Sequence, residues 1–171
     1  MGTQFVNAQA CHEAKPIFMR SIDVLKKYNK VIDNIPYAKQ AKLIADNWNT
    51  IAGNSSAKVG PRKIFLDNSK VTGIVMGQTQ RTFVSPPSPH NKLTITVDKT
   101  GGRAKTDVFI CVHSTKNGSQ QRKEYRFQNS RSSKKKTFTI NNVKGKSVSV
   151  IIKNKSVGNT FKYNVRAKRS R

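Results

Sequence analysis

The chain has 171 residues, of which 33 are Lys or Arg and 8 are Asp or Glu, so its formal net charge at pH 7 is +25. This length suits one domain, or one domain with a small appendage. No apolar run approaches the roughly 18–20 residues of a membrane-spanning helix, which excludes an integral membrane protein of that kind. Hydrophobic residues make up 35% of the chain and are periodic in places, which argues against full disorder.

The positive charge is concentrated toward the end of the chain. Residues 1–53 carry seven Lys or Arg and four acidic residues, a balance of +3, and residues 54–107 carry nine and three, a balance of +6. Residues 108–171 carry seventeen and one, a balance of +16. A Lys-rich codon bias would raise the glutamate content too, yet Glu13 and Glu124 are the only two glutamates. We therefore expect the last third to present a surface that binds a polyanion.

The two cysteines and the start of the chain bear on the compartment. No basic stretch followed by an apolar segment opens the sequence, so no signal peptide is visible, although a signal removed earlier would leave the same sequence. Cys11 and Cys111 lie one hundred residues apart, and two cysteines are too few for a disulfide framework. We expect two free thiols, and the compartment stays open.

Residues 15–53 are predicted to form a helical hairpin that follows an N-terminal arm of residues 1–14. Apolar residues recur there at spacings of three or four, which is typical of helices with one buried face. The first stripe consists of Phe18, Ile22, Leu25, Tyr28 and Ile32. The second stripe consists of Tyr37, Ala41, Ile44, Trp48 and Ile51. Pro16 suits the first turn, Pro36 ends the first helix, and Gly53 ends the second.

From residue 60 to residue 171 the apolar period changes to two, which predicts a strongly basic antiparallel β domain. Gly, Asn, Ser and Pro clusters separate the segments, as expected for short strands joined by turns. The expected strands are Lys63–Asp67, Val71–Met76, Arg81–Val84, Lys92–Asp98, Asp107–His113, Lys123–Gln128, Thr137–Asn141, Ser147–Lys153 and Thr160–Lys168. The predicted fold class is therefore α+β, a helical hairpin followed by an antiparallel β-sandwich or barrel.

The candidate polyanion-binding residues all lie in the last third of the chain. They are Arg122, Lys123, Arg126, Arg131, Lys134, Lys135, Lys136, Lys144, Lys146, Lys162, Arg166, Lys168, Arg169 and Arg171. Strand alternation places Lys162, Arg166 and Lys168 on one face, and Ser130–Lys136 is expected to be an exposed loop. No recognition-helix, zinc-finger or RNP-like pattern is present, so the sequence predicts contacts to repeating anions rather than to bases.

Aromatic, acidic and metal-binding residues give weaker signals. Tyr125 and Phe127 alternate with Arg126, and with Arg126 facing outward the two rings are expected to enter the core. Asp98 and Asp107 flank a Gly-rich turn and are expected to stabilise it rather than hold a cation. A Cys/His metal site lacks CxxC or HxxxH spacing, so we expect no metal and no cofactor.

Three hypotheses about function remain open. The first is a non-catalytic polyanion-binding protein that coats or scaffolds nucleic acid. The second is a secreted adhesion, structural or toxin-like β-protein that binds anionic glycans or a membrane surface. The third is a basic nuclease in which His12, His90 or His113 acts as general base. Non-enzyme is the favoured hypothesis, and assembly into a homo-oligomer or a larger complex stays open.

Overall fold

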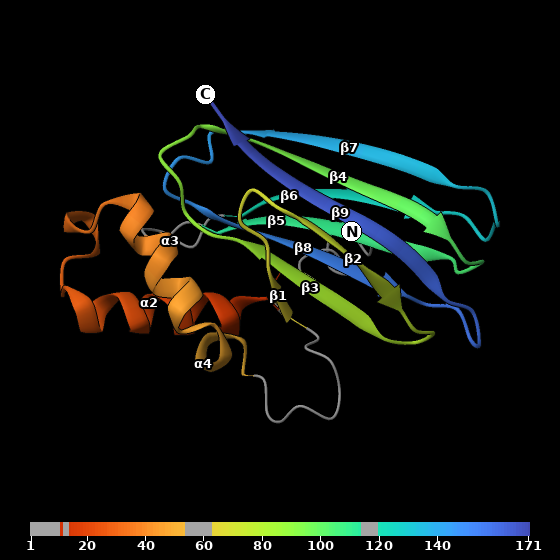
Figure 1. The fold of residues 1–171 in the computed structure, drawn as a ribbon, viewed down its shortest axis with the longest axis horizontal. Helices are drawn as coiled ribbons and strands as arrows, with labels where there is room; N and C mark the ends of the chain where they lie inside the picture. The colour runs from red at the N-terminus through yellow and green to blue at the C-terminus, as the bar shows by residue number, and fades with distance from the viewer. Residues whose placement is uncertain (1–10, 12–13, 54–62, 114–119) are drawn as a thin grey trace.

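A computed structural model describes residues 11, 14–53, 63–113 and 120–171, with the side chains of 120–122 outside this description. The chain forms an N-terminal helical part followed by two β-sheets packed as a sandwich, in agreement with the expected α+β class (Figure 1). The helices are α2 (Lys15–Tyr28), the 3₁₀ helix η1 (Ile32–Asn34), α3 (Tyr37–Asp46) and α4 (Trp48–Ala52). In the described residues no helix is long and apolar enough to cross a membrane.

The helical part is more divided than its two apolar stripes indicate. Helix α2 stops at Tyr28 because Asn29 has an extended backbone, so Ile32 falls in η1 instead of the first helix. The second stripe is split at Asn47, whose side-chain Nδ2 donates a hydrogen bond of 2.8 Å to the Leu43 carbonyl. Gly53 ends α4 with a φ of 67°, a left-handed conformation that suits glycine.

In the described residues nine strands follow, close to the positions where period-two segments predict them. They are β1 (Lys63–Phe65), β2 (Lys70–Val75), β3 (Gln80–Ser85), β4 (Lys92–Gly101), β5 (Thr106–His113), β6 (Gln120–Phe127), β7 (Lys134–Asn141), β8 (Ser147–Asn154) and β9 (Phe161–Ser170). The prediction that Ser130–Lys136 is an exposed loop is wrong for its last three residues. Lys134, Lys135 and Lys136 already pair with β4 and so form the start of β7.

The strands form a five-stranded sheet A in the order β1-β3-β8-β5-β6 and a four-stranded sheet B in the order β2-β9-β4-β7. Strands β2 to β9 build the two four-stranded layers of a jelly roll, and β1 is added at the edge beside β3. The β1–β3 pair is parallel, unlike the other pairs among the described strands, which are antiparallel as predicted.

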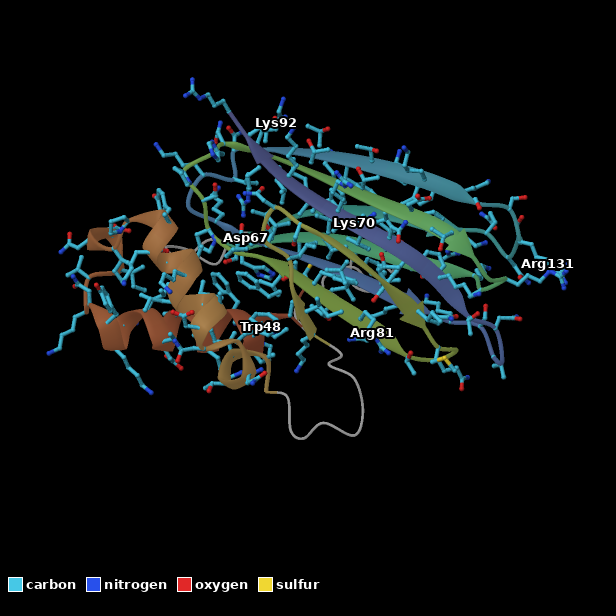
Figure 2. All side chains as sticks on the ribbon, viewed as in Figure 1. Trp48, Asp67, Lys70, Arg81, Lys92 and Arg131 are labelled. Atoms are coloured by element: carbon cyan, nitrogen blue, oxygen red, sulfur yellow. A yellow bond between two sulfur atoms is a disulfide. The ribbon has the colours of Figure 1, made fainter. Side chains whose placement is uncertain are left out.

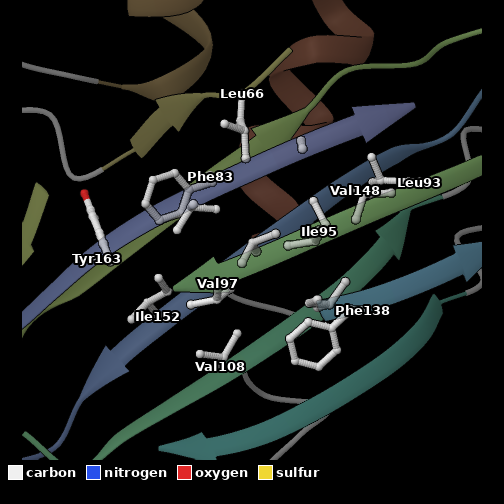
Figure 3. Packing of buried hydrophobic residues seen from close by; sticks show 14 of the residues in the cluster. Leu66, Phe83, Leu93, Ile95, Val97, Val108, Phe138, Val148, Ile152 and Tyr163 are labelled. Atoms are coloured by element: carbon white, nitrogen blue, oxygen red, sulfur yellow. The ribbon is translucent and has the colours of Figure 1, made fainter. Parts of the chain in front are cut away.

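The main core lies between the two sheets, where every second side chain of each strand points inward. Leu93, Ile95 and Val97 of β4 are fully buried, and Phe83 of β3 meets Tyr163 of β9 edge-on with ring centroids 5.4 Å apart (Figure 3). Phe127 also lies in this core, and Tyr125 packs against it, as the sequence predicts. The alternation therefore leaves the outward side chains of each sheet for other contacts.

The helical part lies at one end of the sandwich, where it packs on sheet A beside β1 and the end of β3 (Figure 1). Ile17, Leu25, Ile44 and Ile51 are buried there together with Val84 of β3. Strand β5 is buried along its whole length because it has the sandwich core on one side and the start of the helical part on the other. This cover explains the run Phe109–Val112, in which apolar residues do not alternate with polar ones.

A disulfide joins Cys11 to Cys111, with an S–S distance of 2.08 Å, so the prediction of two free thiols is wrong. Cys11 and Ala14, the described residues that precede α2, are buried on the outer face of β5 with Phe109 and Ile151. This tertiary contact brings together cysteines that are far apart in sequence. Cys11 and Ala14 are packed against the sheet, while the rest of the predicted arm lies outside the described residues.

Candidate polyanion-binding face

The outer face of sheet B carries a group of aligned cations. Strands β2, β9, β4 and β7 turn every second side chain outward, and these side chains are exposed or half-buried. We name this surface the basic face and define it by its cations Lys70, Lys92, Lys135, Lys162, Arg166 and Lys168. Figure 2 shows Lys70 and Lys92 on this sheet, with Arg131 at the end of the sandwich farthest from the helices.

Strand register places the cations of β9 beside polar groups of both neighbouring strands. Arg166 is paired with Lys70 on β2 and with Thr96 on β4, and Lys168 is paired with Thr94. Directly opposite side chains on an antiparallel pair have Cβ atoms about 4.5–5.5 Å apart, and like charges at that distance are destabilising. The juxtaposition of Lys70 and Arg166 is therefore unfavourable for the isolated fold and suits a surface that receives an anion.

Hydroxyl and amide groups fill the spaces between the cations. The Thr72 hydroxyl lies 2.8 Å from Asn164 Oδ1, and the hydroxyl oxygens of Thr96 and Thr137 lie 3.4 Å apart. Asp98 is the one carboxylate on the outward side of the four described strands, and its partners across the sheet are Asn164 and Lys135. The face thus combines an excess of positive charge with neutral hydrogen-bonding groups.

The fourteen candidate residues do not form one surface. Lys135, Lys162, Arg166 and Lys168 belong to the basic face, whereas Lys123 lies on the edge strand β6. Exposed positions outside the face are held by Arg131, Lys134, Lys144 and Arg171. The side chain of Arg122 lies outside the described part of the chain. The basic face also includes Lys70 and Lys92, which charge clustering missed because they precede the strongly basic third.

Arg169 is not a surface residue, so we remove it from the candidate set. Its side chain is buried because it has the same inward parity on β9 as Val165 and Ala167. The guanidinium donates hydrogen bonds to the carbonyls of Pro86 (2.7 Å), Lys146 (2.8 Å) and Val143 (3.1 Å). Burial lowers the pKa of Arg169 to about 10, with Asp67 acting in the opposite direction. Arg169 therefore holds loops together at one end of the sandwich.

Three further candidates are occupied by contacts within the protein. Lys136 is half-buried, and its Nζ lies 5.3 Å from the centroid of the Tyr125 ring. Arg126 Nε donates a hydrogen bond of 2.6 Å to Asp107 Oδ1. Lys146 is half-buried, and its backbone carbonyl accepts one of the Arg169 bonds. The side chains of Lys136 and Arg126 and the backbone of Lys146 thus have structural roles, which the clustering of charge in the sequence does not reveal.

The positions of the histidines and of Asp98 and Asp107 bear on the nuclease hypothesis. His113 is buried, its Nε2 lies 3.0 Å from the Ser149 hydroxyl, and burial lowers its pKa to about 4. His90 is half-buried, and His12 lies outside the described residues. Asp98 and Asp107 point outward from different sheets and so do not share a site. In the described residues no group of His, Cys, Asp or Glu could hold a metal ion.

No protein-family model matches the chain, and no curated protein matches it. Solved structures that are similar to part of the chain include the Yersinia pseudotuberculosis-derived mitogen, at 16% identity over 60% of this chain and 85% of that one, with a TM-score of 0.44. The module TmCBM61, in complex with β-1,4-galactotriose, is 14% identical over 58% of this chain and 70% of that one, with a TM-score of 0.40. The Aeromonas hydrophila inhibitor of g-type lysozyme is 3% identical over 62% and 96%, with a TM-score of 0.40.

Proposed function

We propose that the protein is a non-catalytic binder of anionic glycans and that the basic face of sheet B is its binding surface. The observation that carries this proposal is the cross-strand juxtaposition of Lys70 with Arg166, with threonine hydroxyls around them. Asp98 is the one outward carboxylate on these described strands that offsets their positive charge. A repeating anion would neutralise this charge along the length of β9.

The chemistry of the face matches a sulfated or carboxylated polysaccharide. Lys and Arg donate charge-assisted hydrogen bonds to sulfate and carboxylate oxygens, which are about twice as strong as neutral ones. Thr94, Thr96 and Asn164 can exchange hydrogen bonds with sugar hydroxyls between the charges. Side chains at i and i+2 on β9 lie about 6.6–6.8 Å apart, so Arg166 and Lys168 can contact successive anionic groups.

Two observations favour a glycan over nucleic acid as the partner. The Cys11–Cys111 disulfide is typical of secreted and cell-surface proteins, and disulfides are rare where nucleic acid is coated in a reducing cytosol. The outward positions of β2, β4, β7 and β9 hold no aromatic side chain in the described chain, whereas single-strand binders stack bases on aromatic rings. Nucleic acid and anionic lipid are accordingly the competitors in the test.

The test is competition for labelled heparin at near-physiological salt by single-stranded RNA, duplex DNA and phosphatidylserine vesicles. A triple variant, K162Q/R166Q/K168Q, removes three positive charges from the basic face. The matched control, K26Q/K27Q/K30Q, removes three from exposed positions in the helical part.

We expect heparin to remain bound against each competitor and its affinity to fall in the face variant only. The dependence of log K on log salt should become shallower by roughly 2–3 in that variant, because about three fewer counterions are released. Equal losses in the control variant would show that net charge, and not this face, causes binding. Displacement of heparin by RNA at lower concentration would replace the glycan by nucleic acid.

A further inference from the structure

Three exposed apolar side chains lie at the end of the sandwich farthest from the helices (Figure 1). Val157, in the loop between β8 and β9, is 75% exposed, and Met76, which follows β2, is 55% exposed. Ile74 is 44% exposed on the outward side of β2. We name Ile74, Met76 and Val157 the apolar tip. The other exposed large apolar side chains of the described chain belong to the helical part and are Met19, Tyr28 and Val31.

Close packing of two turns brings the residues of the tip together. A Cβ atom on Gly77 would lie 2.7 Å from the Ser156 carbonyl oxygen and 3.0 Å from the Gly158 backbone nitrogen. Met76 precedes Gly77, and Val157 lies between the other two residues, so the two most exposed apolar side chains come from segments in contact. Glycine at position 77 permits this approach because a side chain there would separate the turns.

Hydrogen bonds hold these turns in position. Asn154 is buried, and its Nδ2 donates to the carbonyls of Val75 (3.0 Å) and Asn159 (2.9 Å). The backbone N–H of Asn154 donates to the Thr79 carbonyl at 3.0 Å. The end of β2 in sheet B is thereby joined to the end of β8 in sheet A. The apolar tip is therefore a formed surface carried by a fixed frame.

The same end of the sandwich carries positive charge. Because β2, β4, β6 and β8 all finish there, it consists of residues 76–79, 102–105, 128–133 and 155–160. None of these residues is Asp or Glu, and their exposed cations are Arg103, Lys105, Arg131 and Lys155. Lys155 is paired with Asp107 at 2.8 Å. Lys162, the partner of Ile74 across the β2–β9 pair, is a further exposed cation.

This combination matches an anionic membrane better than it matches a protein. Binding to a membrane surface increases with the apolar area that enters the interfacial layer and with the attraction of Lys and Arg to anionic headgroups. Three projecting side chains fall short of the roughly 800 Å² that each partner contributes to a standard protein interface. A second copy of the chain would be repelled, because each copy has a net charge of +25.

We propose that the apolar tip inserts into the interfacial layer of an anionic lipid bilayer, with Arg103, Lys105 and Lys162 contacting lipid headgroups. The described helices lie at the other end of the sandwich and do not obstruct this approach (Figure 1). Contact through the tip leaves the part of the basic face around Arg166 and Lys168 open to a glycan. Membrane binding and glycan binding can thus occur together and can fail independently.

The test measures co-sedimentation with vesicles of phosphatidylcholine and phosphatidylserine, with vesicles of phosphatidylcholine alone as the neutral comparison. The tip variant is M76S/V157S. Its matched control, M19S/V31S, removes the same two residue types from exposed positions in the helical part. The heparin affinity and thermal unfolding of each variant are measured alongside, which separates a loss of membrane binding from a loss of glycan binding or of folding.

Tryptophan fluorescence reports insertion directly. Val157→Trp places an indole at the tip, and Val31→Trp places one at an exposed position of the helical part. Trp48, the one native tryptophan, packs on Phe65 and gives the same background in both variants. Indole emission shifts to shorter wavelength when the ring enters a bilayer, and brominated lipids quench it there. Electrostatic contact without insertion leaves the emission of both variants unchanged.

We expect binding to the anionic vesicles to exceed binding to the neutral ones by at least about tenfold, because the cations attract the anionic leaflet. M76S/V157S should bind about tenfold more weakly, since two apolar side chains lose their burial, while M19S/V31S binds as the native chain does. The emission should shift in Val157→Trp and stay unchanged in Val31→Trp.

A charge variant separates this proposal from glycan binding. R166Q/K168Q should lose heparin affinity, and the emission shift should persist when these substitutions are combined with Val157→Trp. Absence of heparin binding in the native chain, with the shift retained, would remove the glycan and leave the membrane contact standing. No shift in Val157→Trp, equal losses in the two serine variants, or equal binding to both kinds of vesicle would overturn the proposal.

Discussion

His113 of β5 stacks on Phe18 of α2, with their ring centroids 5.0 Å apart and their planes inclined by 27°. The imidazole is thus enclosed between a helix and the sheet, and its Nε2 interacts with the Ser149 hydroxyl of β8. Because this environment disfavours the charged imidazolium, burial lowers the pKa of His113 from 6.5 to about 4. The contact between the helical part and sheet A is consequently sensitive to acid.

The sign of this effect gives a prediction for pH dependence. His113 takes up a proton near pH 6.5 in the unfolded chain and near pH 4 in the folded chain. The neutral imidazole therefore makes its full contribution to the free energy of unfolding above pH 6.5, and this contribution is lost as the pH falls toward 4. The loss amounts to about 3 kcal/mol. Urea unfolding at pH 7 and pH 4 should show that His113→Gln reduces the difference between the two pH values by about this amount. His90→Gln serves as the control, and an equal reduction in that variant would contradict the assignment.

Replacement of the buried Arg169 should cost stability without affecting glycan binding directly. Arg169→Met removes the donors of the carbonyls of Pro86, Val143 and Lys146, and we expect the free energy of unfolding to fall by about 3–5 kcal/mol. Lys168→Met, one residue earlier and exposed, should change it by no more than about 0.5 kcal/mol. Denaturant unfolding of the two variants makes the comparison. Similar values for both would mean that the guanidinium is not buried as described.

The disulfide should contribute strongly to stability because it closes a long loop. Cys11 and Cys111 are separated by 100 residues, and removal of such a cross-link releases unfolded-chain entropy. We expect Cys11→Ser/Cys111→Ser to lose about 2–5 kcal/mol in oxidising buffer. Reductant should bring the native chain to the stability of this variant. A native chain that keeps two alkylatable thiols after oxidative refolding would contradict the bridge.

Adjacent lysines at the start of β7 should behave differently. Lys135 is exposed on the basic face, while Lys136 lies over the Tyr125 and Phe138 rings at 5.3 and 5.8 Å from their centroids. Lys135→Gln should weaken heparin binding and leave the melting temperature nearly unchanged. Lys136→Gln should lower the free energy of unfolding by about 1 kcal/mol and affect heparin binding less. Heparin affinity and thermal unfolding are measured on both variants. A loss of binding in Lys136→Gln together with a loss of stability in Lys135→Gln would contradict the assignment.

Strand periodicity predicted the fold well and contained more information about the site than charge clustering did. On β9, Phe161, Tyr163 and Val165 point inward, and the same parity places Arg169 inside. On β4, Leu93, Ile95 and Val97 point inward, and the same parity buries Lys99, whose Nζ contacts the Ser130 carbonyl. Parity therefore separates structural cations from surface cations, provided that it is followed to the end of each strand.

Other features depend on pairings between distant segments and could not be predicted from one sequence. The proximity of Lys70 to Arg166 results from the β2–β9 register. The disulfide likewise requires Cys11, which precedes α2, to lie on the outer face of β5. These relationships depend on the order of strands within the sheets, which local patterns of hydrophobicity do not specify.

The disulfide also determines how the helical part can separate from the sandwich. Cys11 precedes α2 and is bonded to β5, while β1 follows α4 and is paired with β3, so the helices are attached to sheet A at both ends. Local opening of this layer would leave a closed loop that runs from Cys11 to β1 rather than a free arm, and the closure limits the conformational freedom that the chain gains when its contacts break. Reduction would convert this doubly anchored layer into a flap tethered at one end, so the redox state of a single bond controls whether the outer face of β5 can become accessible.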